Sequence, residues 1–150
     1  MIFIGSDHAG LELKESVKSY LIQQGLIFED CGTYSSDSCD YAEIAGVVGS
    51  KVVMNYGNIG LLFCGTGVGM SIAANKIKGV RAACCSDSYS ARMTREHNDA
   101  NVLCLGSRVI GTGLAFELVG IFLNTKFCGE ERHIRRILQI TELENNIDRS

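Results

Sequence analysis

The chain has 150 residues, the size of one ordinary domain, with 46% apolar and 21% charged residues, a balance too apolar for a disordered protein. The net charge of −3 argues against a general nucleic-acid binder, although a local basic cluster can still bind a small anion. No apolar run reaches the roughly 18 residues that a membrane span needs, so we expect one globular domain over residues 1–150 that does not enter a membrane.

Short apolar runs alternate with longer patterns of helical period along the chain. The predicted elements, in order, are a strand at Ile2–Gly5, a helix at Leu11–Gln24, a strand at Ile27–Cys31, a helix at Tyr41–Tyr56, a strand at Gly60–Cys64, a helix at Met70–Lys76, a strand at Val80–Cys85, a helix at Ser88–Glu96, a strand at Val102–Leu105, and helices at Leu114–Asn124 and Glu131–Asn146. In the second helix, Ile44, Val47, Val48 and Val52 are expected to face the core.

This alternation predicts the α/β class. Strands that are apolar on both faces belong in a parallel sheet covered by helices on each side. We therefore expect a three-layer α/β/α, Rossmann-like, doubly wound sheet of five parallel strands. The helix over 131–146 follows the completed sheet, and we expect this extra C-terminal helix to pack on a partner subunit.

The seven cysteines are odd in number and none forms a Cys-x-x-Cys pair. The first ten residues have no basic flank and do not resemble a secretion signal. We therefore expect a cytoplasmic protein without a disulfide framework or a zinc site, in which most of the thiols are buried.

Polar residues suited to acid–base chemistry follow the predicted strands. Ligands of doubly wound sheets bind beyond the carboxyl ends of the strands, so we expect such residues to converge at that edge. The candidates are Asp7 and His8 after the first strand, Cys64 and the glycine loop after the third, Arg108 after the fifth, and the His97-Asn98 pair at the end of the fourth helix.

The loop Cys64–Gly69 is the strongest local signal. Glycines at 65, 67 and 69 let the backbone turn tightly with its N–H groups facing one point, and the next helix aims its positive end there. Such a loop holds a phosphate or a reaction oxyanion. A dinucleotide fingerprint would require glycine at Met70, and a P-loop would require Gly-Lys-Ser/Thr, so both fit less well. A tight turn without a ligand is the alternative.

Cys64 lies directly before this loop, where a thiol near a helix N-terminus ionises more readily and can act as a base or nucleophile. The alternative is a buried strand-end cysteine. His8 and His97 are candidate proton carriers, or surface histidines that cap helix carbonyls. Asp7 suits an N-cap of the first helix, or a group that orients a partner in the site.

Arginines provide candidate phosphate ligands. Arg132 and Arg136 are one helical turn apart and point the same way, which suits a phosphate, whereas the alternative is a solvated helix face. Arg108 is the better single candidate because it follows a strand.

Together these motifs resemble the ribose-5-phosphate isomerase B and galactose-6-phosphate isomerase family. The matching segments cover nearly the whole chain in order and are Gly5–Gly10, Asp40-Tyr41, Cys64–Gly69, Ser71–Lys76, Arg95–Val102, Gly106–Val109, and Arg132-His133 with Arg136. Ala42 departs from the family pattern, which commonly has proline after Asp40-Tyr41, and this leaves the shape of that loop open.

The resemblance implies a role for each matching residue. Cys64 is the base that moves a proton from C2 to C1 of the sugar, His97 opens the furanose ring, and Thr66 assists proton movement between oxygens. The other implied roles are enediolate binding by the backbone of Gly65, Thr66, Gly67, Val68 and Gly69, sugar binding by Asp7, His8 and Asn98, and phosphate binding by Arg108, Arg132 and Arg136.

The resemblance also implies a homodimer or homotetramer with active sites shared between subunits, a small sugar phosphate as substrate, and no metal or organic cofactor. The His97-Asn98 pair favours ribose 5-phosphate, which is converted to ribulose 5-phosphate. The alternatives are an isomerase of allose or galactose 6-phosphate, and a non-catalytic nucleotide- or flavin-binding module.

Overall fold

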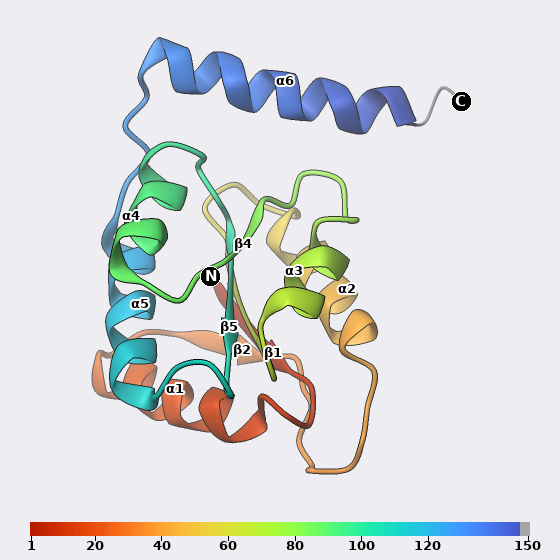
Figure 1. The fold of residues 1–150 in the computed structure, drawn as a ribbon, viewed down its shortest axis with the longest axis vertical. Helices are drawn as coiled ribbons and strands as arrows, with labels where there is room; N and C mark the ends of the chain where they lie inside the picture. The colour runs from red at the N-terminus through yellow and green to blue at the C-terminus, as the bar shows by residue number, and fades with distance from the viewer. Residues whose placement is uncertain (148–150) are drawn as a thin grey trace.

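The computed structural model describes residues 1–147 and contains one parallel sheet with the strand order β2-β1-β3-β5-β4 (Figure 1). The strands are β1 (Ile2–Ser6), β2 (Phe28–Asp30), β3 (Ile59–Cys64), β4 (Ala82–Cys84) and β5 (Val102–Gly106). The helices are α1 (Leu11–Gln23), α2 (Tyr41–Val52), α3 (Val68–Ala74), α4 (Ser88–Glu96), α5 (Thr112–Asn124) and α6 (Glu131–Ile147). The predicted doubly wound α/β class is confirmed.

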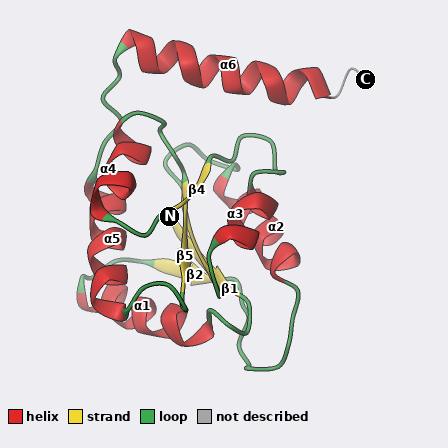
Figure 2. Cartoon of the chain, viewed as in Figure 1, coloured by secondary structure: helices red, strands yellow, loops and turns green. Residues whose placement is uncertain are grey.

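Helices cover both faces of the sheet (Figure 2). Side chains of α1, α4 and α5 form one core cluster with the sheet, and those of α2 and α3 form the other. Every residue of β1 and β5 is buried, as expected for strands enclosed on both faces. Polar loops at the strand ends are therefore the places where chemistry can meet solvent.

Helix α2 differs from its prediction in two ways. It ends at Val52, and the chain then turns through the exposed Tyr56 to Gly57, whose φ of 88° ends regular structure. Val47 is 44% exposed, whereas Gly49 is buried and packs closely against Ile77. The prediction placed the larger aliphatic residue inward, but close packing of α2 on its neighbours requires the small one.

Ala42, which departs from the family pattern, lies at the start of α2. Asp40 is the N-cap residue and Ala42 lies exposed in the first helical turn. Proline and alanine are both accommodated in the first turn of a helix, so Ala42 is compatible with the helix start seen here.

Helix α6 lies beyond the amino ends of the strands, apart from the three layers (Figure 1). Its second half is tied to the body where the Gly79 N–H donates to the Glu144 carboxylate. Four large apolar side chains of α6 are 41–66% exposed, namely Ile134, Leu138, Ile140 and Leu143. Within residues 1–147, no helix is long and apolar enough to cross a membrane.

Candidate active site

Cys64 is the last residue of β3 and its side chain is buried. The backbone N–H of Gly67 donates to its Sγ at 3.0 Å. Gly67 has φ 80°, and a Cβ there would lie 2.9 Å from the Cys84 sulfur and 3.0 Å from the carbonyl carbon of Leu105. Only glycine therefore lets the loop fold over the thiol with an N–H aimed at its sulfur.

The amides of the loop surround the space beside this thiol. The Val68 N–H donates to Thr66 Oγ1 at 3.3 Å, and Thr66 itself is exposed. Among the described residues, the N–H groups of Thr66 and Gly69 have no acceptor. They remain available to a bound anion, as the spacing of the glycines predicts.

Arg108 lies against the same loop. The backbone N–H of Arg108 donates to the Gly65 carbonyl oxygen at 3.0 Å, and the backbone N–H of Ser107 donates to the Cys64 carbonyl oxygen at 2.9 Å. A Cβ on Gly65 would lie 3.3 Å from Nη1 of Arg108, so the guanidinium packs on the glycine backbone. The loops after β3 and β5 thus bring a thiol, free amides and a cation to one edge.

Asp7 and His8 lie at this edge too, at the end of β1. The buried Asp7 carboxylate accepts the Gly10 N–H at 3.0 Å, so it caps the turn before α1, while Gly10 is the N-cap residue itself. His8 Nδ1 accepts the Cys39 N–H at 3.3 Å, which leaves Nε2 as the protonated nitrogen of the neutral ring. His8 therefore joins the loop before α2 to the site.

His97 and Asn98 lie at the opposite edge, and the expected convergence on one edge is wrong for them. His97 is the C-cap residue of α4, and β5 starts soon after, at Val102. Val102 pairs beside Gly60 and Gly106 pairs beside Cys64, so the two edges are about 13 Å apart at 3.3 Å per strand residue. The reason is that α4 begins beyond β4 and runs back along the sheet.

Arg132 and Arg136 share this second edge because α6 starts beside the end of α4. The Cys128 N–H donates to the Glu96 carbonyl oxygen at 3.0 Å, and the rings of His97 and His133 stack with centroids 4.2 Å apart. Arg132 and Arg136 are exposed, and Arg132 Nε pairs with Glu130 at 2.8 Å. The candidate residues thus fall into two separate groups, which we name the thiol half-site (Asp7, His8, Cys64–Gly69, Arg108) and the imidazole half-site (His97, Asn98, Arg132, Arg136).

The imidazole half-site is held by a cluster of ion pairs. Asp99 has φ 44° and pairs with Arg95 at 3.1 Å and Arg81 at 3.2 Å. The Arg81 Nε also donates to the Asn98 carbonyl oxygen at 3.0 Å. These contacts give the Arg95–Asn101 segment a rigid turn that presents His97 and Asn98.

His133 is a site neighbour that the sequence analysis did not single out. Its side chain is buried against His97, and burial, together with the charges of His97 and Arg132, lowers its pKa. Only the placement of α6 on α4 brings these rings together, although Arg132-His133 was part of a matching segment.

The other cysteines differ from Cys64. All seven lie in the described residues as free thiols, but only Cys64, Cys85 and Cys104 are buried, so the expectation that most are buried is wrong. Burial raises the pKa of Cys85 to about 11 and that of Cys104 well above its usual value, so both stay protonated. Their position at the sheet suits packing.

A thiol next to backbone N–H groups without acceptors, with a guanidinium nearby, is typical of an enzyme that transfers protons on an anionic substrate. The chain belongs to the ribose/galactose isomerase family, whose model matches residues 2–140. It is a sugar-phosphate isomerase.

Individual relatives agree in both sequence and structure. The chain is 45% identical over 143 residues to ribose-5-phosphate isomerase B of Escherichia coli, with 95% of each protein covered. A solved structure of the Thermotoga maritima ribose 5-phosphate isomerase is 52% identical, with a TM-score of 0.91 over 94% of this chain and 97% of that one. A structure of the Mycoplasma genitalium ribose-5-phosphate isomerase B with bound ribulose-5-phosphate is 42% identical, with a TM-score of 0.92 over 96% and 95%.

Proposed function

We propose that the enzyme interconverts D-ribose 5-phosphate and D-ribulose 5-phosphate, with Cys64 as the base. The observation that carries this proposal is the Cys64 sulfur held under the Gly67 N–H inside a loop with free amides. The thiolate takes the proton from C2 of the open-chain aldose, the C–H electron pair forms the C1–C2 double bond, and the carbonyl pair moves onto O1. Amides aimed at the developing charge stabilise this enediolate.

The second half of the reaction returns the proton. The Cys64 thiol gives it to C1 while the hydroxyl at O2 loses its own proton, which leaves the ketone at C2. Thr66, exposed within the loop, assists transfer of that proton from O2 to O1. His97 acts earlier, as the acid that protonates the ring oxygen when the C1–O bond of the furanose breaks, while the anomeric O1 hydroxyl loses its proton to solvent and becomes the aldehyde oxygen.

We assign the remaining candidates to binding. Asp7, His8 and Asn98 contact the sugar, and Arg108, Arg132 and Arg136 hold the phosphate through charge-assisted hydrogen bonds. The exposed state of the three guanidinium groups supports this assignment, because a ligand can reach them.

We further propose that each active site combines the thiol half-site of one subunit with the imidazole half-site of another, in a homodimer or a larger homo-oligomer. A separation of about 13 Å along the strands prevents one chain from bringing Cys64 and His97 to one sugar. The exposed apolar residues of α6, including Leu138 and Leu143, offer a surface that a second copy can cover.

The choice of a pentose over allose or galactose 6-phosphate rests on the relatives and on the presence of His97 and Asn98. The test is a coupled assay that compares the three aldose phosphates on the wild-type protein and on Cys64→Ala. We expect kcat/KM to be highest for ribose 5-phosphate, and Cys64→Ala to abolish turnover without loss of fold. Full activity of that variant would refute the role of Cys64, and a preference for a hexose phosphate would refute ribose 5-phosphate as the substrate.

The free thiols also support our placement of the enzyme in the reducing cytoplasm.

A further inference from the structure

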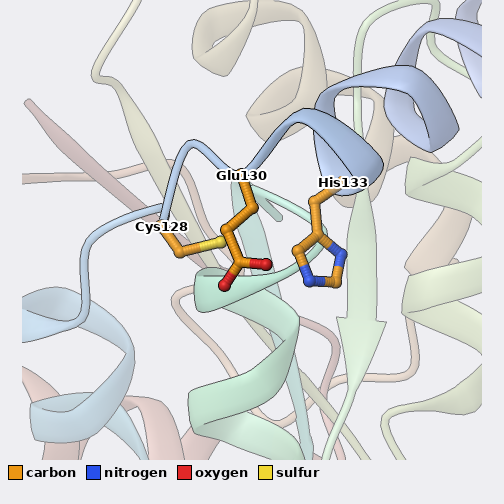
Figure 3. Close-up of side chains that lie close together, drawn as sticks. All are labelled: Cys128, Glu130 and His133. Atoms are coloured by element: carbon orange, nitrogen blue, oxygen red, sulfur yellow. The ribbon is translucent and has the colours of Figure 1, made fainter.

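Three potential metal ligands meet where the chain enters α6. The thiol of Cys128, the carboxylate of Glu130 and the imidazole of His133 have ligand atoms within 4.8 Å of one another. Figure 3 shows the three side chains turned toward a common space. The backbone beneath them is anchored, because the Cys128 N–H donates to the Glu96 carbonyl oxygen at 3.0 Å and the Glu130 carbonyl oxygen accepts the His133 N–H at 2.9 Å.

His133 has a nitrogen without a partner. The residue is only 6% exposed, and its Nε2 is buried with no hydrogen-bond partner among the described residues. A buried polar atom is costly unless a donor or a cation meets it. Stacking on His97 at 4.2 Å, with the ring planes 7° apart, fixes the orientation of this imidazole.

Glu130 is positioned for the same purpose. Its Oε2 pairs with Arg132 Nε at 2.8 Å, which leaves the other carboxylate oxygen for an ion. A hydrogen-bonded partner of this kind orients a metal-ligating carboxylate and is a normal part of metal sites. Arg132 therefore does not compete for the whole carboxylate.

We propose that Cys128, Glu130 and His133 bind one zinc-type divalent cation. Thiolate, imidazole and carboxylate together are a ligand set that Zn²⁺ accepts, and three protein ligands leave one tetrahedral position open. Zinc bonds of about 2.0–2.3 Å separate tetrahedral ligand atoms by roughly 3.3–3.8 Å, and the exposed Cys128 and Glu130 side chains are free to close to that spacing.

No zinc site was expected from the sequence because none of the seven cysteines forms a Cys-x-x-Cys pair. The fold supplies what the spacing lacks, since the turn before α6 and the stacked His97 bring the three groups together. An ion there would tie the first turn of α6, which carries Arg132, to the segment before it and hold His133 in its stack on His97.

The test uses Co²⁺ as a spectroscopic probe added to the full chain in phosphate-free buffer with a non-thiol reductant. We expect one Co²⁺ per chain, with visible bands of tetrahedral intensity and a near-ultraviolet thiolate-to-cobalt band, and displacement of Co²⁺ by Zn²⁺. Cys128→Ser should abolish the thiolate band. Glu130→Gln should weaken binding by roughly tenfold or more, because even the loss of an outer-shell partner costs 10- to 100-fold.

Two matched variants serve as controls. Cys84→Ser removes the other exposed thiol, and Glu131→Gln removes the neighbouring exposed carboxylate, so both should bind Co²⁺ as the wild type does. The absence of a thiolate band in the wild type, or a band that survives Cys128→Ser, would overturn the proposal. All four substituted side chains (Cys128, Glu130, Cys84 and Glu131) are exposed, so the circular dichroism spectrum of each variant should match that of the wild type.

Discussion

Two inactive variants are expected to restore activity when they form mixed dimers. Cys64→Ala lacks the proposed base and His97→Ala lacks the proposed ring-opening acid, and the two residues lie at opposite edges of the sheet. In a mixed dimer, one site pairs the intact Cys64 of one subunit with the intact His97 of the other. The second site carries both substitutions and is dead.

The expected gain follows from symmetry. A two-fold dimer has two equivalent sites, so random pairing of equal amounts gives half mixed dimers and leaves about a quarter of all sites intact. Loss of a general acid typically costs 10²–10⁴ in rate, so this recovery stands well above the background of either variant. The assay is ribose 5-phosphate turnover after joint unfolding and refolding, with each variant refolded alone for comparison.

A matched pair tests whether the two half-sites are assigned correctly. Cys64→Ala and Arg108→Ala both alter the thiol half-site, so every site in their mixed dimer contains a defect and little activity should return. The shared site would be refuted if the refolded mixture of Cys64→Ala and His97→Ala showed only the summed turnover of the two separate variants. Equal recovery in both mixtures would refute the division into half-sites.

Further predictions concern the parts that hold the thiol half-site. Lys14 is fully buried, and its Nζ lies 2.7 Å from Asp30 Oδ1. Asp30→Ala should therefore lower the free energy of unfolding in denaturant titrations by about 3–5 kcal/mol, because it leaves a buried charge unpaired. A loss below about 1 kcal/mol would show that the buried Lys14 ammonium does not depend on Asp30. Burial alone would raise the pKa of Asp30, but hydrogen bonds from its lysine partners outweigh burial and lower that pKa from 3.8. Its contribution is therefore present above pH 3.8 and is lost as the pH falls through the lowered value, so acid unfolding of Asp30→Asn should lack this component. Gly67→Ala places a Cβ 2.9 Å from Cys84 Sγ and pulls the N–H away from Cys64, so kcat should fall by roughly 10². Gly46→Ala in α2, with no atom within 4 Å of the new Cβ, is the control and should keep wild-type kcat.

Most of the fold could be predicted from the sequence because each central strand is enclosed. Residues 60–64 and 102–105 are apolar without alternation, which is the pattern of strands buried on both faces. The position of the thiol half-site followed for the same reason, since Cys64 ends β3, Arg108 closely follows β5, and both strands end at one edge. The prediction of buried residues was wrong where close helix packing requires a small side chain, as in α2, where Gly49 is buried and Val47 is exposed.

The imidazole half-site could not be placed from the sequence by the same rule. A residue after a strand lies at the carboxyl edge, but a residue after a helix that returns along the sheet lies at the other edge, and His97 follows α4. The placement of α6 is not encoded in strand and helix periods at all. Its stacking on α4 through His133 therefore had to come from the structure.

The proposed shared site accounts for the exposed amphipathic helix that follows the completed sheet. The thiol half-site is built on β–α junctions, where the backbone of one chain can hold Gly67 against Cys64 with little freedom. The proposed acid His97 and the proposed phosphate ligands Arg132 and Arg136 lie at the end of α4 and the start of α6, which the Asp99 ion pairs and the His97–His133 stack hold in place. Under the proposed shared site, the two halves complete one another between copies, so covering the apolar residues of α6 and assembling the active site are the same event.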